Sequence, residues 1–503
     1  MKSTTLGLIS LFITILISIF FIGYTKTNYD VGYGDFYVFI SIHQLIDAGY
    51  SLYKDIWDHK DLGFYLFNQV FYKIFGIKGL FISTLFVIII FYFSFLYYLK
   101  KNLILKNNYP LALLSVFFIV SIDSFISTHG ETQAPLIILS GIFLYNFNKY
   151  ISFFLFVLAL SIKISGLPII ILFFIFKFLQ YDSKKNFIFK ELLPLVIFLL
   201  ISISLFFLII ILFKKSYLLA GWNEITHFNK IYAENIRGNN LFSLNSRDLA
   251  IDIARVFFYF TKDTAIFFIL SIFSLFINLI FFKKLSKDEL NFFLVNTYLY
   301  IFLIFAALCV MYLHIPVAFH HYQFLNPFLI TYFLINFALL INKFKYSHLV
   351  YILIIISFSF KINIQDIKNN FSNFIDPING KGELSYEISN LENKSFILLG
   401  GNHIKLDYSS LKKDKLNMSC RFFYQLEHII DNYFIEMIDC INEKPDIIFL
   451  LKDKDLLKIF YGKYFEEIMK LMNKLTEQEY KICGDNNYFF IYSRNSDFCK
   501  RIE

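Results

Sequence analysis

The chain has 503 residues, 57% of them hydrophobic, with 67 phenylalanines, a net charge of +8 and a mean hydropathy of +0.58. Ordinary soluble domains are at most about half apolar, so this composition excludes a soluble enzyme and favours an integral membrane protein. The positive charge is mostly lysine placed between apolar segments, a pattern typical of membrane topology and not of nucleic-acid binding.

Eleven apolar segments predict transmembrane helices, because a bilayer core requires about 20 apolar residues in helical form. The first should be retained and not cleaved as a signal peptide, since only Lys2 precedes it and no A-x-A-like site follows. The segments are 6–22, 79–99, 109–126, 134–148, 150–164, 166–180, 191–213, 264–282, 290–313, 322–341 and 348–361.

Lysines gather at every second connection between these segments, at 100–106, 184–190, 283–287 and 343–345. The positive-inside rule then predicts a cytoplasmic N-terminus in a multi-pass protein of the cell (inner) membrane. Lys214 and Lys215, at an outer end, do not fit this pattern. A transmembrane domain is expected over 1–361, with large outer loops at 23–78 and 214–263, and a soluble extracytoplasmic domain over 362–503.

The first outer loop is rich in ionisable residues, with five aspartates between 34 and 65. The stretch "DFYVFISIHQLIDAG" predicts an amphipathic helix on the membrane surface, and a second interfacial helix should end at Gly76. At the first turn, Asp35 either caps the helix or belongs to a catalytic site. The cluster of Asp58, His59 and Lys60 is either a local ion pair or part of the same site, and its spacing fits no standard zinc pattern.

Other polar patches are expected on the same side of the membrane. "STHGETQAP" carries His129 and Glu131, and "HIPVAFHHYQFLNP" carries three histidines. The loop 214–263 holds Arg237, Arg247 and Arg255, and the arginine fork suits phosphate oxygens. Each patch alone is typical of interfacial anchoring. Together they predict an outer polar site for an anionic, lipid-borne molecule.

The tail after residue 362 alternates short apolar strands with helical patterns, which predicts a small α/β domain. The expected strands are "SFILLGG" (395–401), "PDIIFLL" (445–451) and "NYFFIYS" (487–493), with a helix over "YFEEIMKLMNKL". Gly400–Gly401 lacks the full G-x-G-x-x-G pattern, so no nucleotide site is expected there.

Four cysteines lie in this tail and allow three pairings. Outside the cytoplasm an even number favours disulfides, and we expect the sequence-local pairs Cys420–Cys440 and Cys483–Cys499. The alternative is four free thiols in a reducing compartment. A zinc site is disfavoured because no C-x-x-C spacing occurs.

The segment "GDFYVFISIHQLIDAGYSLYKDIWDHKDLGFYLFNQVFYKIFG" resembles the first outer loop of the GT-C-type glycosyltransferases, which include the aminoarabinose transferases and the protein O-mannosyltransferases. "THGETQAPLIILSGIFLY" and "FHHYQFLNPFL" look like two later segments of that family, and "FILLGG…MSCRFFY…KPDIIFL" looks like its outer soluble domain. The matching positions are Asp35, Gly49, Tyr53, Asp55, Asp58, Lys60, Tyr65, Gly76, Glu131, His321, Tyr322 and Pro327.

The resemblance implies an inverting transfer of a sugar from a polyprenyl-phosphate donor to a glycan, lipid or protein acceptor on the outer side. It implies that Asp35 acts as general base or orients the acceptor, and that Lys60 holds the donor phosphate. We expect Arg237 to assist at the phosphate. The supporting residues of the cavity would be Asp58, Glu131, His321 and Tyr322.

The chain departs from the family pattern at two places. Phe36 stands where many members have a second acidic residue, so a divalent metal held by paired carboxylates is not favoured, and no other cofactor is expected. Asp61–Leu62 replaces the usual Gly-Pro after the lysine.

Two other functions remain open. The arginines of 214–263 suit a polysaccharide polymerase or ligase that uses a diphosphate-linked oligosaccharide. A transporter or flippase is the third alternative, but the candidate internal charges Asp123 and Lys163 lie near predicted span ends, and no internal repeat is visible.

Overall fold

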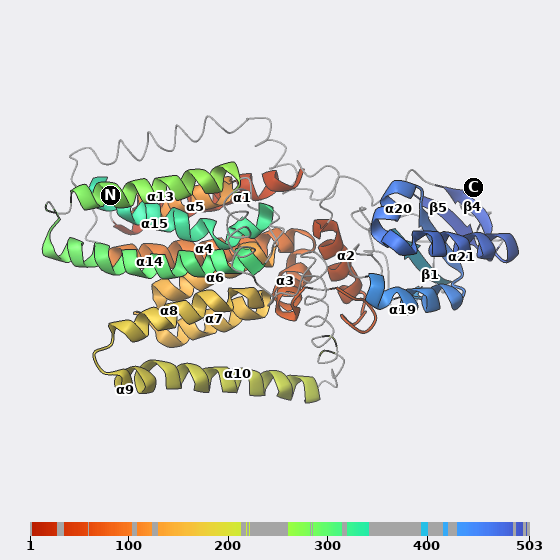
Figure 1. Ribbon diagram of the computed structural model, residues 1–503, viewed down its shortest axis with the longest axis horizontal. Helices are drawn as coiled ribbons and strands as arrows, with labels where there is room; N and C mark the ends of the chain where they lie inside the picture. The colour runs from red at the N-terminus through yellow and green to blue at the C-terminus, as the bar shows by residue number, and fades with distance from the viewer. Residues whose placement is uncertain are drawn as a thin grey trace, which may run out of the picture. The chain divides into compact units, whose positions relative to one another are not determined.

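The computed structural model describes residues 3–27, 35–58, 60–102, 108–122, 129–212, 218, 221, 260–281, 283, 285–313, 319–341, 394–400, 416–420, 430–485, 489–495 and 499. The chain divides into two compact units (Figure 1). The helical unit comprises Met1–Asn28, Asp61–Ile209 and Asn240–Pro377, and the sheet unit comprises Tyr29–Lys60, Ile210–Asn239 and Ile378–Glu503.

The helical unit is a bundle of apolar helices. Helix α6 packs against α4 and α7, α15 packs against α5 and α13, and α14 packs against α8. Its helices are α1 (Ser3–Thr27), α3 (Leu62–Phe75), α4 (Lys78–Asn102), α5 (Asn108–Ser121), α6 (Gly130–Leu144), α7 (Lys149–Ile162), α8 (Leu167–Gln180), α9 (Lys184–Phe187), most of α10 (Leu193–Leu212), α13 (Lys262–Ile280), α14 (Lys287–Leu313) and α15 (Asn326–Ile341), with short turns η1 (Ile164–Gly166), η2 (Ile188–Leu192) and η4 (Phe319–Phe324).

Four helical segments of the described chain are long and apolar enough to cross a membrane: Lys78–Asn102, Lys184–Leu205, Lys262–Ile280 and Lys287–Met311. The expected count of eleven full-length spans is therefore not reproduced. Helices do form in the predicted segments between 134 and 180, but each has only 14 or 15 residues. At 1.5 Å per residue, such a helix covers roughly 21 Å of a hydrocarbon core of about 30 Å. The predicted span 348–361 lies outside the described residues.

The short helices end at turn-forming residues within the apolar sequence. Asn148 caps the start of α7 by accepting the backbone N–H groups of Tyr150 and Ile151, and the "ISGLP" segment breaks the chain between α7 and α8. These breaks fall between the predicted segments 134–148, 150–164 and 166–180, which are themselves 15 residues each, so the short helices follow from the sequence and only their reading as full-length spans is not reproduced.

In helix α1 of this unit, polar side chains point inward and large apolar side chains point outward. In α1, Ser10, Thr14 and Ser18 are buried, whereas Leu8 is 68% and Phe12 is 62% exposed. The Tyr92 hydroxyl donates to Ser10 Oγ over 2.6 Å and joins α4 to α1. In a membrane the apolar surface meets lipid and polar side chains join helices together, so this distribution supports the predicted class of membrane protein.

A buried polar network fixes the start of α6 against α3 and α4. The Gln133 side-chain amide donates to Asn68 Oδ1 over 3.1 Å and to Thr84 Oγ1 over 3.2 Å. Ser83 also donates to Asn68 Oδ1. These three helices are therefore held in register next to Glu131, in the first turn of α6.

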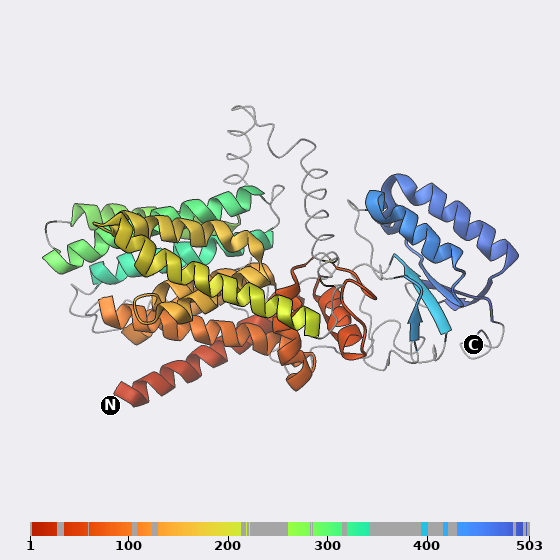
Figure 2. The ribbon, with the colours of Figure 1, turned by 90° about the horizontal axis from the view of Figure 1, so that it is seen from below.

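The sheet unit contains a five-stranded sheet in the order β2-β1-β3-β5-β4. β1 pairs in parallel with β2 and β3, and β5 pairs antiparallel with β3 and β4. The strands are β1 (Lys394–Leu399), β2 (Leu416–Met418), β3 (Ile447–Leu451), β4 (Lys481–Asp485) and β5 (Phe489–Ser493); the helices that lie along them in Figure 2 are α19 (Ile430–Asn442), α20 (Lys454–Tyr461) and α21 (Phe465–Gln478).

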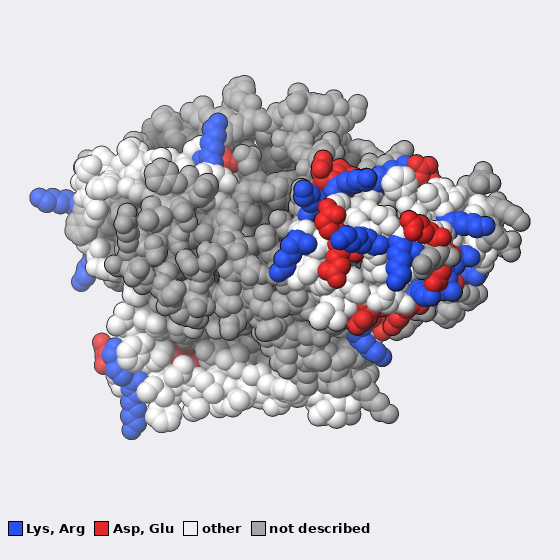
Figure 3. Space-filling view, turned by 45° about the vertical axis from the view of Figure 1, so that its right-hand side comes forward, with Lys and Arg blue, Asp and Glu red and all other residues white. Residues whose placement is uncertain are grey.

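The structure confirms the three predicted strands and the predicted α/β character of the tail. It also confirms both expected disulfides, Cys420–Cys440 and Cys483–Cys499. Lysine, arginine, aspartate and glutamate intermingle over the described surface of this unit in Figure 3, whereas the described surface of the helical unit in that view carries few charges. The first surface suits water and the second suits lipid.

The two helices expected on the membrane surface differ from each other. Helix α2 (Asp35–Asp47) is buried at every position from 38 to 45, so it is not the surface-lying amphipathic helix that the sequence predicted. Helix α3 buries one face, which includes Asn68 and Gln69, and exposes Leu66 and Val70 on the other. The apolar outer face of α3 agrees with an interfacial position.

Candidate active site

The segment that carries the strongest resemblance brings Lys60 next to helix α2 within the sheet unit. Asp35 is the first residue of α2, and Phe39 lies one turn later on the same face of the helix. The Lys60 ammonium lies over the Phe39 ring, 5.8 Å from its centroid. The fold thus brings Lys60, which is 25 residues from Asp35 in the sequence, to Phe39, one turn into the helix that begins with Asp35.

The backbone of Lys60 is fixed at both ends of the residue. Its carbonyl accepts the Tyr53 hydroxyl over 2.8 Å, and its N–H faces Asp58 Oδ2 at 3.4 Å. Asp58 is buried, with 1% of its surface exposed, while the Lys60 side chain is partly exposed. This arrangement restrains the position of the Lys60 backbone in a partly exposed loop.

Tyr53 adopts a strained backbone conformation in the same loop, with φ at +69°. A left-handed conformation of a non-glycine residue costs on the order of 1–3 kcal/mol and persists where the surroundings impose it. Here the Tyr53 N–H donates to Ile56 over 2.6 Å, and the Ser51 N–H donates to Asp55 Oδ2 over 2.8 Å. The loop is therefore closely specified around Lys60.

Gly221 of the sheet unit contacts this loop, and Tyr50 lies at the start of the loop. A Cβ added to Gly221 would lie 2.4 Å from Tyr53 Cβ, so the second large loop approaches the first at a point where only glycine fits. Burial and the nearby Asp55 carboxylate together raise the pKa of Tyr50 to about 12. Tyr50 is thus a neutral hydrogen-bonding group at physiological pH and not a proton acceptor.

A second polar cluster lies in the helical unit, at the start of α6. Lys163 Nζ lies 2.7 Å from Glu131 Oε1, and His129 Nδ1 lies 3.6 Å from Glu131 Oε2. Glu131 is only 2% exposed. Its carboxylate sits in the first turn of α6, where the helix dipole and the Lys163 ammonium both favour negative charge. We call His129, Glu131 and Lys163 the α6 cluster.

Helix α3 approaches the α6 cluster through Asp61 and Gly63. The Asp61 carboxylate faces the backbone N–H of Ile164, the residue after Lys163, at 3.4 Å. A Cβ on Gly63 would lie 2.4 Å from the Ser161 carbonyl oxygen, so α3 and α7 are in backbone contact there. Asp61 and Gly63 therefore fix the distance between the start of α3 and Lys163.

The remaining predicted site residues are only partly described. His321 and Tyr322 lie in η4, which packs against α6, and Tyr322 is 1% exposed with its ring 5.7 Å from that of Phe260. Arg237, His59 and the Asp35 side chain lie outside the described residues. No group of three histidine, cysteine, aspartate or glutamate residues in the described ranges could hold a metal ion.

Sequence reasoning did not identify the partner of Glu131. Lys163 stands out only as a charge inside an apolar stretch, and it is 32 positions from Glu131 in the sequence. Charged residues in apolar segments usually have a partner, which is the one signal that could have linked the two. Comparison with models of known protein families and with curated proteins found no match to this chain.

Proposed function

We propose that this protein is a membrane glycosyltransferase of the GT-C type that moves a sugar from a polyprenyl-phosphate donor to an extracytoplasmic glycan, lipid or protein. The observation that carries the proposal is the position of the Lys60 ammonium over Phe39, one turn from Asp35. A cation and a carboxylate-bearing position lie at one helix start, as phosphate binding and acceptor activation would require.

In the proposed reaction, an acceptor oxygen or nitrogen attacks the anomeric carbon of the sugar while the bond from that carbon to the phosphate oxygen breaks. The acceptor gives its proton to the Asp35 carboxylate. The lipid phosphate leaves with the bonding electron pair, and Lys60 stabilises the negative charge that grows on it. Attack opposite the leaving phosphate inverts the configuration of the sugar carbon.

Two features support an extracytoplasmic sheet unit in a multi-pass protein of the cell membrane with a cytoplasmic N-terminus. Its two disulfides suit an oxidising compartment. The lysine clusters of the sequence, which by the positive-inside rule favour the cytoplasm, support an N-terminus on that side.

The other site residues take supporting roles in the proposal. Arg237 assists Lys60 at the phosphate, and Asp58 positions the Lys60 backbone. Glu131, which is held by Lys163, takes a supporting role with His321 and Tyr322.

The test compares surface glycans and lipid-linked sugars, by mass spectrometry, in cells that carry or lack the gene. We expect deletion to remove one sugar residue from a surface glycan, lipid or protein and to leave unspent polyprenyl-phosphate sugar. Accumulation of unpolymerised oligosaccharide repeats would contradict the proposal and favour a polymerase.

Matched variants connect the activity to the site. Asp35→Asn and Lys60→Met should each fail to restore the missing sugar. Asp47→Asn, at the exposed end of α2, and Lys54→Met, exposed in the same loop, should restore it. Full restoration by Asp35→Asn would leave Asp35 with the role of a helix cap.

A further inference from the structure

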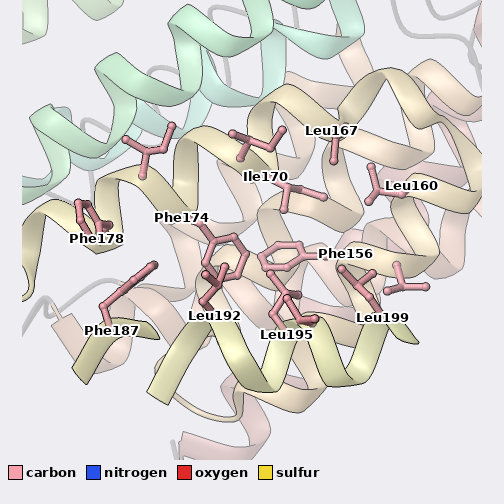
Figure 4. Close-up of a pocket in the computed structure, with 14 residues that line it drawn as sticks. Phe156, Leu160, Leu167, Ile170, Phe174, Phe178, Phe187, Leu192, Leu195 and Leu199 are labelled. Atoms are coloured by element: carbon pink, nitrogen blue, oxygen red, sulfur yellow. The ribbon is translucent and has the colours of Figure 1, made fainter. Parts of the chain in front are cut away.

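A long apolar slot lies between α7 and α8 on one side and α10 on the other. Figure 4 shows side chains of α8, such as Ile170 and Phe174, facing side chains of α10, such as Leu195, across it. All fourteen residues that line the slot are apolar, and its volume is about 440 Å³. That volume falls within the range of ligand sites in proteins, roughly 300–1,000 Å³.

The length of the slot matches one leaflet of a bilayer. Along α8 it runs from Leu167 to Phe178, which is roughly 17 Å at 1.5 Å per residue. Half of a hydrocarbon core of about 30 Å is about 15 Å. An apolar space of this kind excludes water and, if empty, loses the dispersion contacts of its lining. A single lipid chain would restore those contacts.

One end of the slot is strongly basic. Phe178, Phe187 and Leu192 form that end of the lining, and the chain between them carries the exposed Lys184, Lys185 and Lys190. The Lys184 ammonium donates to the carbonyls of Phe178 and Tyr181, which leaves Lys185 and Lys190 as the exposed cations that project from this turn.

The acidic groups at this end do not cancel the lysines. Asp182 is exposed in the same turn, whereas Glu191 is buried and accepts the hydroxyls of Tyr145 and Tyr181. The Lys149 ammonium donates to the Lys190 carbonyl. These bonds fix the α9–η2 segment to the ends of α6, α7 and α8, so the basic end is a fixed feature of the fold.

We propose that the slot binds one acyl chain of an anionic phospholipid, with the lipid phosphate at Lys185 and Lys190. The apolar lining accepts the chain, and the two ammonium groups select a negative headgroup over a neutral one. The sequence places this end on the cytoplasmic side, where anionic lipids create a negative surface potential. The site is separate from Lys60 and does not depend on the proposed transfer reaction.

The test is lipid binding to the purified full-length protein in detergent, measured by native mass spectrometry. The probes are phosphatidylglycerol, phosphatidylcholine with the same acyl chains, and glycerol phosphate alone. We expect phosphatidylglycerol to bind more tightly than phosphatidylcholine, and glycerol phosphate not to compete. Equal binding of the two phospholipids, or effective competition by glycerol phosphate, would overturn the proposal.

Two sets of variants test the two halves of the site. Lys185→Gln with Lys190→Gln should weaken phosphatidylglycerol binding about thirtyfold, since each lysine near a membrane surface contributes about 1 kcal/mol, and should leave phosphatidylcholine unchanged. Lys283→Gln with Lys287→Gln, exposed lysines at another joint, should have no effect. If Lys185→Gln with Lys190→Gln leaves the affinity for phosphatidylglycerol unchanged, the lipid phosphate does not bind at these two lysines.

Val196→Trp should fill the slot and weaken both phospholipids at least tenfold. Ile201→Trp, which is exposed on the face of the same helix that points away from the slot and is outside the lining, should bind as the unmodified protein does. Helicity and elution volume identify any variant that fails to fold. A folded Val196→Trp variant with normal phospholipid binding would show that the acyl chain does not occupy the slot.

Discussion

The ion pair of the α6 cluster offers a quantitative test of the helical unit. Lys163→Met would leave the Glu131 carboxylate buried without its nearest cation. At 2.7 Å and an effective dielectric constant of about 20, the Coulomb attraction of the pair is roughly 6 kcal/mol, and the cost of removing both charges from water offsets much of it. Breaking a buried pair on one side typically costs about 3–5 kcal/mol.

The double variant Glu131→Gln with Lys163→Met removes both charges together. Because neutral replacement of a buried pair is often nearly neutral in stability, we expect the double variant to lose no more than about 1 kcal/mol. The coupling energy in the double-mutant cycle should then be at least about 2 kcal/mol. The structure thus predicts that the second substitution rescues the first.

The measurement is the free energy of unfolding in mixed detergent micelles, followed by helical circular dichroism. Lys287→Met, at the exposed start of α14, serves as the control and should change stability by less than about 0.5 kcal/mol. If Glu131→Gln and Lys163→Met each cost less than about 1 kcal/mol of unfolding free energy and their effects simply add, the Glu131–Lys163 pair is refuted. Sugar transfer by the rescued double variant would in addition exclude Glu131 from the proposed site.

Three further predictions concern close packing, covalent links and pH. Gly63→Ala should destabilise the helical unit by about 1–3 kcal/mol in the same unfolding assay, because a Cβ would meet the Ser161 carbonyl, whereas Gly7→Ala, with a nearest contact at 3.4 Å, should be tolerated. Cys420→Ser with Cys440→Ser should lower the unfolding free energy of the sheet unit by about 3 kcal/mol in denaturant, because the disulfide closes a loop of 20 residues. Cys309→Ser, whose cysteine is outside any disulfide, should cost less than about 1 kcal/mol. Equal effects of the two variants would argue against the Cys420–Cys440 disulfide. Burial raises the pKa of Tyr480 to about 12 in the folded protein, against about 10 in the unfolded chain. The stability that neutral Tyr480 contributes is therefore present below pH 10 and is lost as the pH rises to 12. Between pH 10 and pH 12 the unfolding free energy of Tyr480→Phe should fall less steeply than that of the unmodified protein, and identical slopes would contradict the burial effect.

The sequence was informative wherever local chemistry decides the structure. The strands around Ile397, Phe449 and Ile491 are apolar runs between turn residues, so their positions follow from composition alone. The disulfides join cysteines that are 20 and 16 residues apart, a separation at which local pairing is a sound expectation. Strand β2 has three residues, and β4 alternates little, so neither carries a readable pattern.

The sequence failed where long-range packing decides. The spacing of Val38, Ile42 and Leu45 indicates one apolar face of α2, but helical spacing cannot show that the opposite face is also covered. The same limit concealed the Glu131–Lys163 pair, whose members come from different helices. The slot beside α10 depends on how the α9–η2 turn is fixed by Glu191, which no local pattern encodes.

Direct turnover of the lipid donor tests the central claim most closely. The substrate is the lipid extract of cells that lack the gene, where unspent donor should accumulate, supplied with the deficient acceptor to purified protein in liposomes. We predict that the unmodified protein and Asp47→Asn convert polyprenyl-phosphate sugar to polyprenyl phosphate, while Asp35→Asn and Lys60→Met do not. A donor pool that stays unchanged with the unmodified protein, or that Asp35→Asn consumes at the same rate, would contradict the account.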